Sequence, residues 1–152
     1  YCLERVVADK NSEHNLVLFP KDKIFLFGLN DEAVKFRNTV LSDLVMELRQ
    51  QTNQGQPESV VGIEGNIQWP GDYPLADQMS LSDLIRIAGD VGPNTDLQYV
   101  LLVRENTEGT TLSANSFDLS QESGVRAANS FILFPRDKVF VFDEQFTRLL
   151  SA

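Results

Sequence analysis

The sequence predicts an α+β fold, a mixed sheet with one helix packed across it. An extended apolar run with a Pro-Gly turn leads directly into a short amphipathic helix within residues 60–92. Residues 97–104 read LQYVLLVR, a largely apolar segment that is typical of a buried strand. An apolar segment that turns at a proline occurs twice, at residues 16–27 and 131–142. Because the hairpin and the helix each have one apolar face, we expect the helix to pack across the sheet.

The predicted hairpin comes first in this central stretch. Val61, Ile63 and Ile67 are apolar positions on one side of its first, extended run, which Gly62 and Gly65 interrupt. Pro70 and Gly71 then predict a turn, because proline presets φ and glycine tolerates a positive φ. The extended chain resumes at Tyr73.

A short helix is predicted directly after the hairpin. Ser80 stands three residues before Asp83, a spacing that allows the hydroxyl and the carboxylate to cap the first turn. Gly89 is placed to end the helix as a C-terminal cap. The apolar residues recur with helical spacing and would form one face: Leu81, Leu84, Ile85 and Ala88.

The two proline segments are an internal repeat. Residues 16–27 read LVLFPKDKIFLF, and residues 131–142 read FILFPRDKVFVF. Pro20 and Pro135 fix a bend, while Asp22 and Asp137 are able to accept hydrogen bonds from the turn backbone. Such a repeat indicates a repeated structural unit. We therefore expect two corners of the same shape, flanked by apolar runs that pair as strands or pack beneath the sheet.

The central stretch resembles a known domain family. It reads Val-x-Ile-x-Gly-x-Ile-x-x-Pro-Gly-x-Tyr-Pro-Leu and then Ser-Leu-Ser-Asp-Leu-Ile-x-x-Ala-Gly. This pattern is similar to the SLBB domain, the soluble-ligand-binding β-grasp module, and more narrowly to its copies in outer-membrane polysaccharide export proteins. The resemblance implies a β-grasp fold and tandem units that each end in a proline-aspartate corner. One departure is Asp90, which follows Gly89 where the family often has a second glycine.

The resemblance also implies a division of the chain. The helix that joins the units is predicted from Asn38 to Gln51, and the following polar, turn-forming residues are the linker. The expected parts are the tail of a preceding SLBB unit at 1–30, the connecting helix and linker at 31–56, a complete unit at 57–143, and the start of a following helix at 144–152.

As a function, the resemblance implies a non-catalytic periplasmic module of a polysaccharide exporter. Such units associate with neighbouring SLBB units and face the inner-membrane export machinery and the polysaccharide, and no cofactor is implied. The alternative is a soluble module that binds a small ligand or an oligosaccharide in a concave pocket. An enzyme ranks third, because no nucleophile elbow and no phosphate-binding loop appear, and the carboxylates are interpreted as a solvated acidic surface.

The charge composition argues against two classes of partner. With 22 acidic and 13 basic residues the formal net charge is −9, which argues against nucleic acid and anionic membrane surfaces as partners. No apolar run approaches the length of a membrane span. Cys2 is the only cysteine, so no internal disulfide is expected, and His14 is interpreted as a surface residue.

Aromatic residues are the remaining candidates for ligand contact. Trp69 and Tyr73 flank the hairpin tip, where they would either stack on a sugar ring or cover the end of the core. We favour the core interpretation. The phenylalanines at every second position of the repeats are interpreted as sheet core or unit–unit packing rather than ligand contacts: Phe25, Phe27, Phe140 and Phe142.

Overall fold

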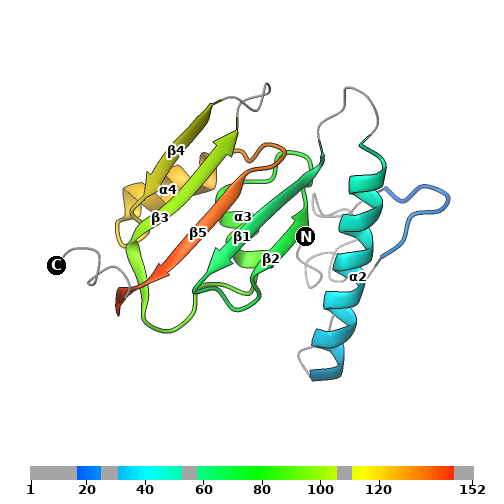
Figure 1. Ribbon diagram of the computed structural model, residues 1–152, viewed down its shortest axis with the longest axis horizontal. Helices are drawn as coiled ribbons and strands as arrows, with labels where there is room; N and C mark the ends of the chain where they lie inside the picture. Colours follow the sequence, from blue (N-terminus) through cyan, green and yellow to red (C-terminus); the bar gives the residue numbers. More distant parts are fainter. Residues whose placement is uncertain (1–16, 25–30, 53–57, 106–110, 146–152) are drawn as a thin grey trace. The chain divides into compact units, whose positions relative to one another are not determined.

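The computed structural model describes residues 17–24, 31–52, 58–105 and 111–145. The chain divides into two compact units, residues 1–34 and 35–152. In order, the elements are α2 (Asp31–Gln50), β1 (Val60–Gly65), β2 (Gly71–Pro74), α3 (Leu81–Ile87), β3 (Thr95–Glu105), β4 (Leu112–Phe117), α4 (Glu122–Ser130) and β5 (Lys138–Asp143) (Figure 1). The second unit combines a mixed sheet with helices, which confirms the predicted α+β class.

The sheet has five strands in the order β2-β1-β5-β3-β4. β1 pairs antiparallel with β2 and parallel with β5, while β3 pairs antiparallel with both β5 and β4. Val139 of the central strand β5 lies opposite Ile63 of β1 and Leu102 of β3. The strand that follows the second proline corner therefore joins the two halves of the sheet.

One face of the sheet carries the core. Figure 1 shows α3 and α4 on the same side of the sheet, and Leu84 of α3 and Ala128 of α4 are both fully buried there. This confirms that the predicted helix packs across the sheet. The buried residues of this cluster come from every strand and both helices: Val61, Ile63, Ile67, Tyr73, Met79, Leu81, Leu84, Ile85, Ala88, Val100, Leu102, Phe117, Ala128, Leu133, Val139 and Val141.

Both ends of α3 are capped as the sequence predicts. The Ser80 hydroxyl accepts from the Asp83 N–H at 3.1 Å, and the Asp83 carboxylate accepts from the Ser80 N–H at 3.1 Å. At the other end, Gly89 has φ +87° and Asp90 has φ +62°. The N–H of Asp90 donates to the carbonyl of Ile85, which closes a Schellman-type cap. Asp90 thus adopts the left-handed conformation that a second glycine would favour.

Replacing Ser80 with Ala is expected to lower the free energy of unfolding by about 1 kcal/mol at neutral pH. The Ser80 hydroxyl, followed by its N–H, holds the pKa of Asp83 below its usual range. A carboxyl group with a lowered folded-state pKa stabilises the fold above its ordinary pKa and loses that contribution as the pH falls through the lowered value. Chemical denaturation at pH 7 and pH 3 should therefore show a smaller difference between the variant and the wild type at pH 3.

The connecting helix begins earlier than predicted. α2 begins at Asp31, seven residues before the predicted start at Asn38, because acidic residues are favourable in a first helical turn even without apolar periodicity. After β4 the chain forms the nine-residue helix α4. Gly124 allows α4 to lie close to the chain that follows β4, because a Cβ there would lie 1.8 Å from the carbonyl oxygen of Asp118.

The phenylalanines of β5 do not form the sheet core. Val139 and Val141 point into the core, whereas Phe140 and Phe142 alternate with them and are half-buried on the opposite face. Phe142 stacks on Tyr99, with ring centroids 5.8 Å apart. Their equivalents, Phe25 and Phe27, lie outside the described residues, as do Cys2 and His14. None of the helices in the described part of the chain has the length and apolarity needed to cross a bilayer.

Candidate functional site

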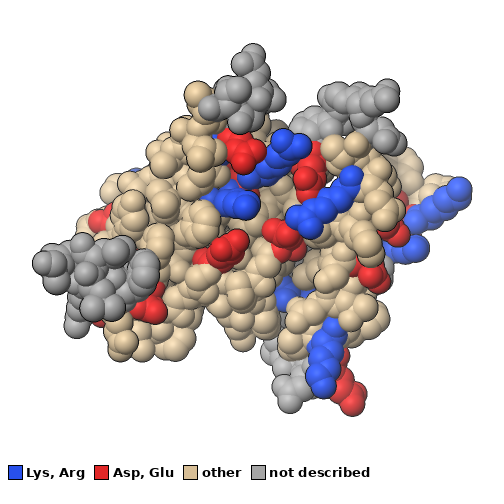
Figure 2. Space-filling model, in the orientation of Figure 1, with Lys and Arg blue, Asp and Glu red and all other residues tan. Residues whose placement is uncertain are grey.

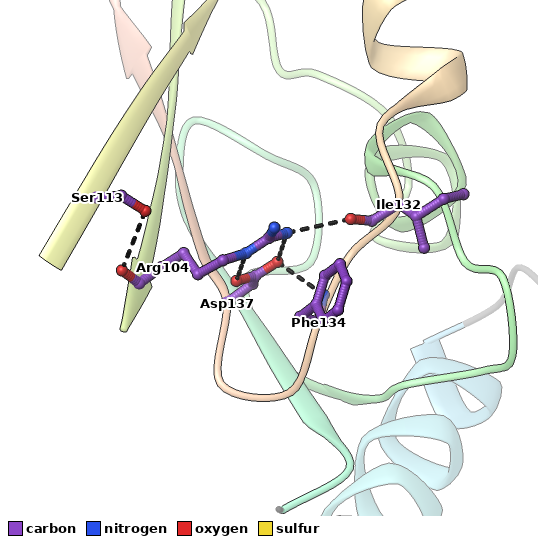
Figure 3. A network of polar contacts seen from close by, with 5 residues as sticks. All are labelled: Arg104, Ser113, Ile132, Phe134 and Asp137. Atoms are coloured by element: carbon purple, nitrogen blue, oxygen red, sulfur yellow. Dashed lines mark hydrogen bonds and ion pairs between the residues drawn. The ribbon is translucent and has the colours of Figure 1, made fainter. Parts of the chain in front are cut away.

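The second proline corner, residues 131–138, contains a network of polar contacts with Arg104 (Figure 3). Pro135 precedes Arg136, which has φ +68°, and the N–H of Asp137 donates to the carbonyl of Phe134 at 3.1 Å. A proline followed by a residue of positive φ is the pattern of a type II turn. The N–H of Phe134 also donates to Oδ2 of Asp137 at 2.8 Å, so the carboxylate closes the turn as predicted.

An arginine of β3 completes this corner. Nε of Arg104 donates to Oδ1 of Asp137 at 2.8 Å, and Nη2 donates to Oδ2 at 2.6 Å. The same Nη2 donates to the carbonyl oxygen of Ile132 at 3.1 Å, and the guanidinium lies 4.3 Å from the ring centre of Phe134 (Figure 3). The Asp137 side chain is fully buried. A two-pronged fork is the geometry that best compensates a buried carboxylate.

The corner also holds β1 in place. The N–H of Arg136 donates to the carbonyl of Val60 at 2.8 Å, and the N–H of Gly62 donates to the carbonyl of Asp137 at 2.9 Å. β5 begins at the next residue and β3 supplies Arg104. The corner therefore makes hydrogen bonds to β1 and β3 and leads directly into β5.

The first proline corner, residues 17–24, has the same internal geometry. Lys21 has φ +79°, and the N–H of Asp22 donates to the carbonyl of Phe19 at 3.0 Å. The N–H of Phe19 donates to Oδ2 of Asp22 at 2.7 Å. These bonds repeat those of Phe134 and Asp137, so the predicted likeness of the two corners is confirmed.

Tyr73 lies on the edge strand β2, opposite Val61 of β1, and Trp69 lies in the chain between β1 and β2. Tyr73 is buried, and its hydroxyl donates to the carbonyl of Trp69 at 2.6 Å and accepts from Nη2 of Arg37 at 3.0 Å. The Arg37 guanidinium lies 4.3 Å from the ring centre of Trp69, and its Nη2 also donates to the carbonyl of Ile87. A Cβ on Gly89 would lie 2.5 Å from Cε3 of Trp69. The Tyr73 ring is thus core, and Trp69 is half-buried against Arg37.

A cleft of about 420 Å³ opens beside Trp69. Its walls come from α2, from the chain between β1 and β2, and from β2 itself. Its lining residues are Asn38, Leu41, Ser42, Gln68, Trp69, Pro70, Gly71, Asp72 and Tyr73. Amide, hydroxyl and carboxylate groups beside an indole are suited to hydrogen bonding with a polar ligand. Pro70 and Gly71 of the predicted turn form part of this wall.

A second cleft, of about 240 Å³, lies on the face of the sheet away from the core and contains charges of both signs. Arg49 of α2 bridges Glu58 and Asp72 with contacts of 2.5 and 2.8 Å, and hydrogen bonding to Glu58 raises the pKa of Arg49. Lys138 and Arg136 also line this cleft. On the face drawn in Figure 2, basic and acidic side chains are intermixed rather than gathered in patches of one sign.

Sequence reasoning identified the aspartates but missed the two arginines. Arg37 precedes the predicted start of the connecting helix, and nothing local indicates that it reaches Tyr73. Arg104 directly follows the apolar residues 99–103 of β3, and a charge adjoining such a run is the signal that would have marked it. Within the described ranges, no group of three or more His, Cys, Asp and Glu is arranged to hold a metal ion.

Neither a protein-family model nor a curated protein matches this chain. The interpretation of its function therefore depends on the sites above and on the resemblance of residues 60–92.

Proposed function

We propose that this chain is a non-catalytic module of an outer-membrane exporter of capsular or extracellular polysaccharide, and that it acts in assembly of the export channel. In this proposal residues 57–143 form an SLBB β-grasp unit, the parent protein works in the periplasm, and neighbouring units associate with one another. The partners are the inner-membrane export machinery and the polysaccharide itself.

The repeated corner is the observation that supports the proposal best. Two segments with equal turn geometry, one of them built into a complete sheet, are expected of a chain made of tandem units. The order of hairpin, capped helix and further strands agrees with a β-grasp unit. Half-buried apolar residues on the open face of the sheet, among them Leu101, Val103 and Phe140, suit contact with another protein surface.

The assembly role is tested in a bacterium that carries the gene. Deleting the gene is expected to remove polymer from the cell surface while polymer synthesis continues, and chemical cross-linking of the intact protein should capture closed oligomers. A protein that stays monomeric, together with unchanged secretion after deletion, would contradict the proposal.

The alternative is a soluble module for a small ligand or an oligosaccharide, and the cleft beside Trp69 favours it. Trp69 is the only tryptophan, so its fluorescence reports this site alone. Titration with neutral and acidic oligosaccharides should shift the emission if a sugar enters the cleft, and Asn38→Ala should weaken the response. An unchanged spectrum across the panel would count against a sugar contact at Trp69.

A further inference from the structure

The two proline corners differ in what covers them. In the second corner Leu133 is 4% exposed and Val139 is fully buried in the core. Their equivalents in the first corner, Leu18 and Ile24, are 57% and 66% exposed. An apolar surface of this kind on a turn with a defined conformation indicates a surface that another segment covers.

The carboxylate of the first corner differs in the same way. Asp22 and Asp137 hold the same turn hydrogen bonds, but Asp137 is fully buried under Arg104 and Asp22 is exposed. Among the described residues, Asp22 accepts only from the backbone of its own turn. Arg104 is already engaged by Asp137, so it is not available to Asp22.

We propose that the first corner, residues 17–24, is a docking element for an arginine-bearing β-strand of a second β-grasp unit. Asp22 receives the guanidinium of that strand as a two-pronged fork, in the manner that Asp137 receives Arg104. This inference rests on the proposed function, because tandem or associating units supply such a strand.

The second corner defines the chemistry of the partner strand. In the sheet Lys138 lies opposite Val103, and Arg104 is the next residue of β3. The partner strand therefore runs antiparallel to Lys23 and Ile24. One of its residues lies opposite Lys23, as Val103 lies opposite Lys138, and the next residue is the arginine. A lysine would not replace it, because an ammonium group lacks the planar pair of donors that matches a carboxylate.

A peptide with the sequence of β3, residues 95–105, is the probe. We would add two lysines and a fluorophore to its N-terminus and measure fluorescence anisotropy as the full chain is added. We expect saturable binding that Asp22→Asn weakens by roughly tenfold or more, because a charge-assisted fork is lost. Asparagine keeps an oxygen that accepts from the Phe19 N–H, so the turn itself should persist.

Three controls decide the result. Asp43→Asn removes an exposed carboxylate of α2 and should leave the affinity unchanged. A β3 peptide with Lys in place of Arg104 should bind the wild-type chain as weakly as the unchanged peptide binds the Asp22→Asn chain. A scrambled peptide should not bind. Absence of binding by the β3 peptide, or equal binding to wild type and Asp22→Asn, would overturn the docking proposal and leave the export role standing. Loss of the export role with peptide binding intact would remove only the polysaccharide assignment.

Discussion

Replacing Arg104 with Met is expected to lower the free energy of unfolding by about 3–5 kcal/mol, because the buried Asp137 carboxylate would lose its fork. Methionine keeps much of the apolar stem that lies against Phe134. Urea denaturation followed by circular dichroism measures the change directly. Asp137→Asn should cost a comparable amount, since it weakens the same pair and the bond that closes the turn.

A matched control separates burial from charge alone. Arg126 and Glu122 of α4 form an ion pair whose side chains are 75% and 80% exposed. Arg126→Met should therefore change stability by at most about 0.5 kcal/mol. The double variant Arg104→Met with Asp137→Asn should lose less than the sum of the two single losses, because it leaves no uncompensated charge. Strictly additive losses would show that the two side chains do not act as a pair.

Replacing Gly65 with Ala is expected to cost about 3 kcal/mol or more, because both the backbone and the neighbouring strand oppose a side chain there. Gly65 has φ +98°, and an added Cβ would lie 1.9 Å from the carbonyl oxygen of Val141. That oxygen accepts the N–H of Asn66 at 2.7 Å, so the contact between β1 and β5 would have to open. Thermal denaturation should show a large fall in Tm.

Gly71 provides the control for this change. It also has a positive φ, +147°, but nothing lies within 4 Å of an added Cβ. Gly71→Ala should therefore cost only the conformational strain, about 1 kcal/mol. Equal losses for the two glycines would mean that the close approach of β5 to Gly65 does not matter for stability.

Local patterns predicted the parts of the fold that depend on nearby residues. The capping box at Ser80 and Asp83 and the turn bonds of the two corners each join residues three positions apart, so spacing alone reveals them. The amphipathic face of α3 likewise required only helical periodicity.

Contacts between residues far apart in the sequence were not predicted, because local spacing carries no information about them. Arg104 and Asp137 are 33 positions apart, and Arg37 and Tyr73 are 36 apart. An arginine occurs both on solvent-exposed surfaces and in bidentate pairs with a carboxylate. The strand order decides which of these two environments it occupies. The pattern left Phe140 and Phe142 either in the sheet core or in unit–unit packing, because a one-residue shift in register exchanges the two faces of a strand. The structure excludes the first of these two positions.

We propose that each proline corner closes a sheet unit by accepting an arginine fork. The most direct test is an NMR measurement of how fast arginine side-chain Nε–H groups exchange with water. One sample is the chain labelled with ¹⁵N-arginine, and the other is the β3 peptide labelled with ¹⁵N-arginine and mixed with the unlabelled chain. We expect the Nε–H of Arg104, assigned from Arg104→Lys, to exchange slowly with water and to become fast in Asp137→Asn. We also expect the peptide arginine to gain a slow Nε–H with the wild-type chain and not with Asp22→Asn. A fast-exchanging Arg104 Nε–H in the wild-type chain, or a peptide signal indifferent to Asp22, would contradict the claim.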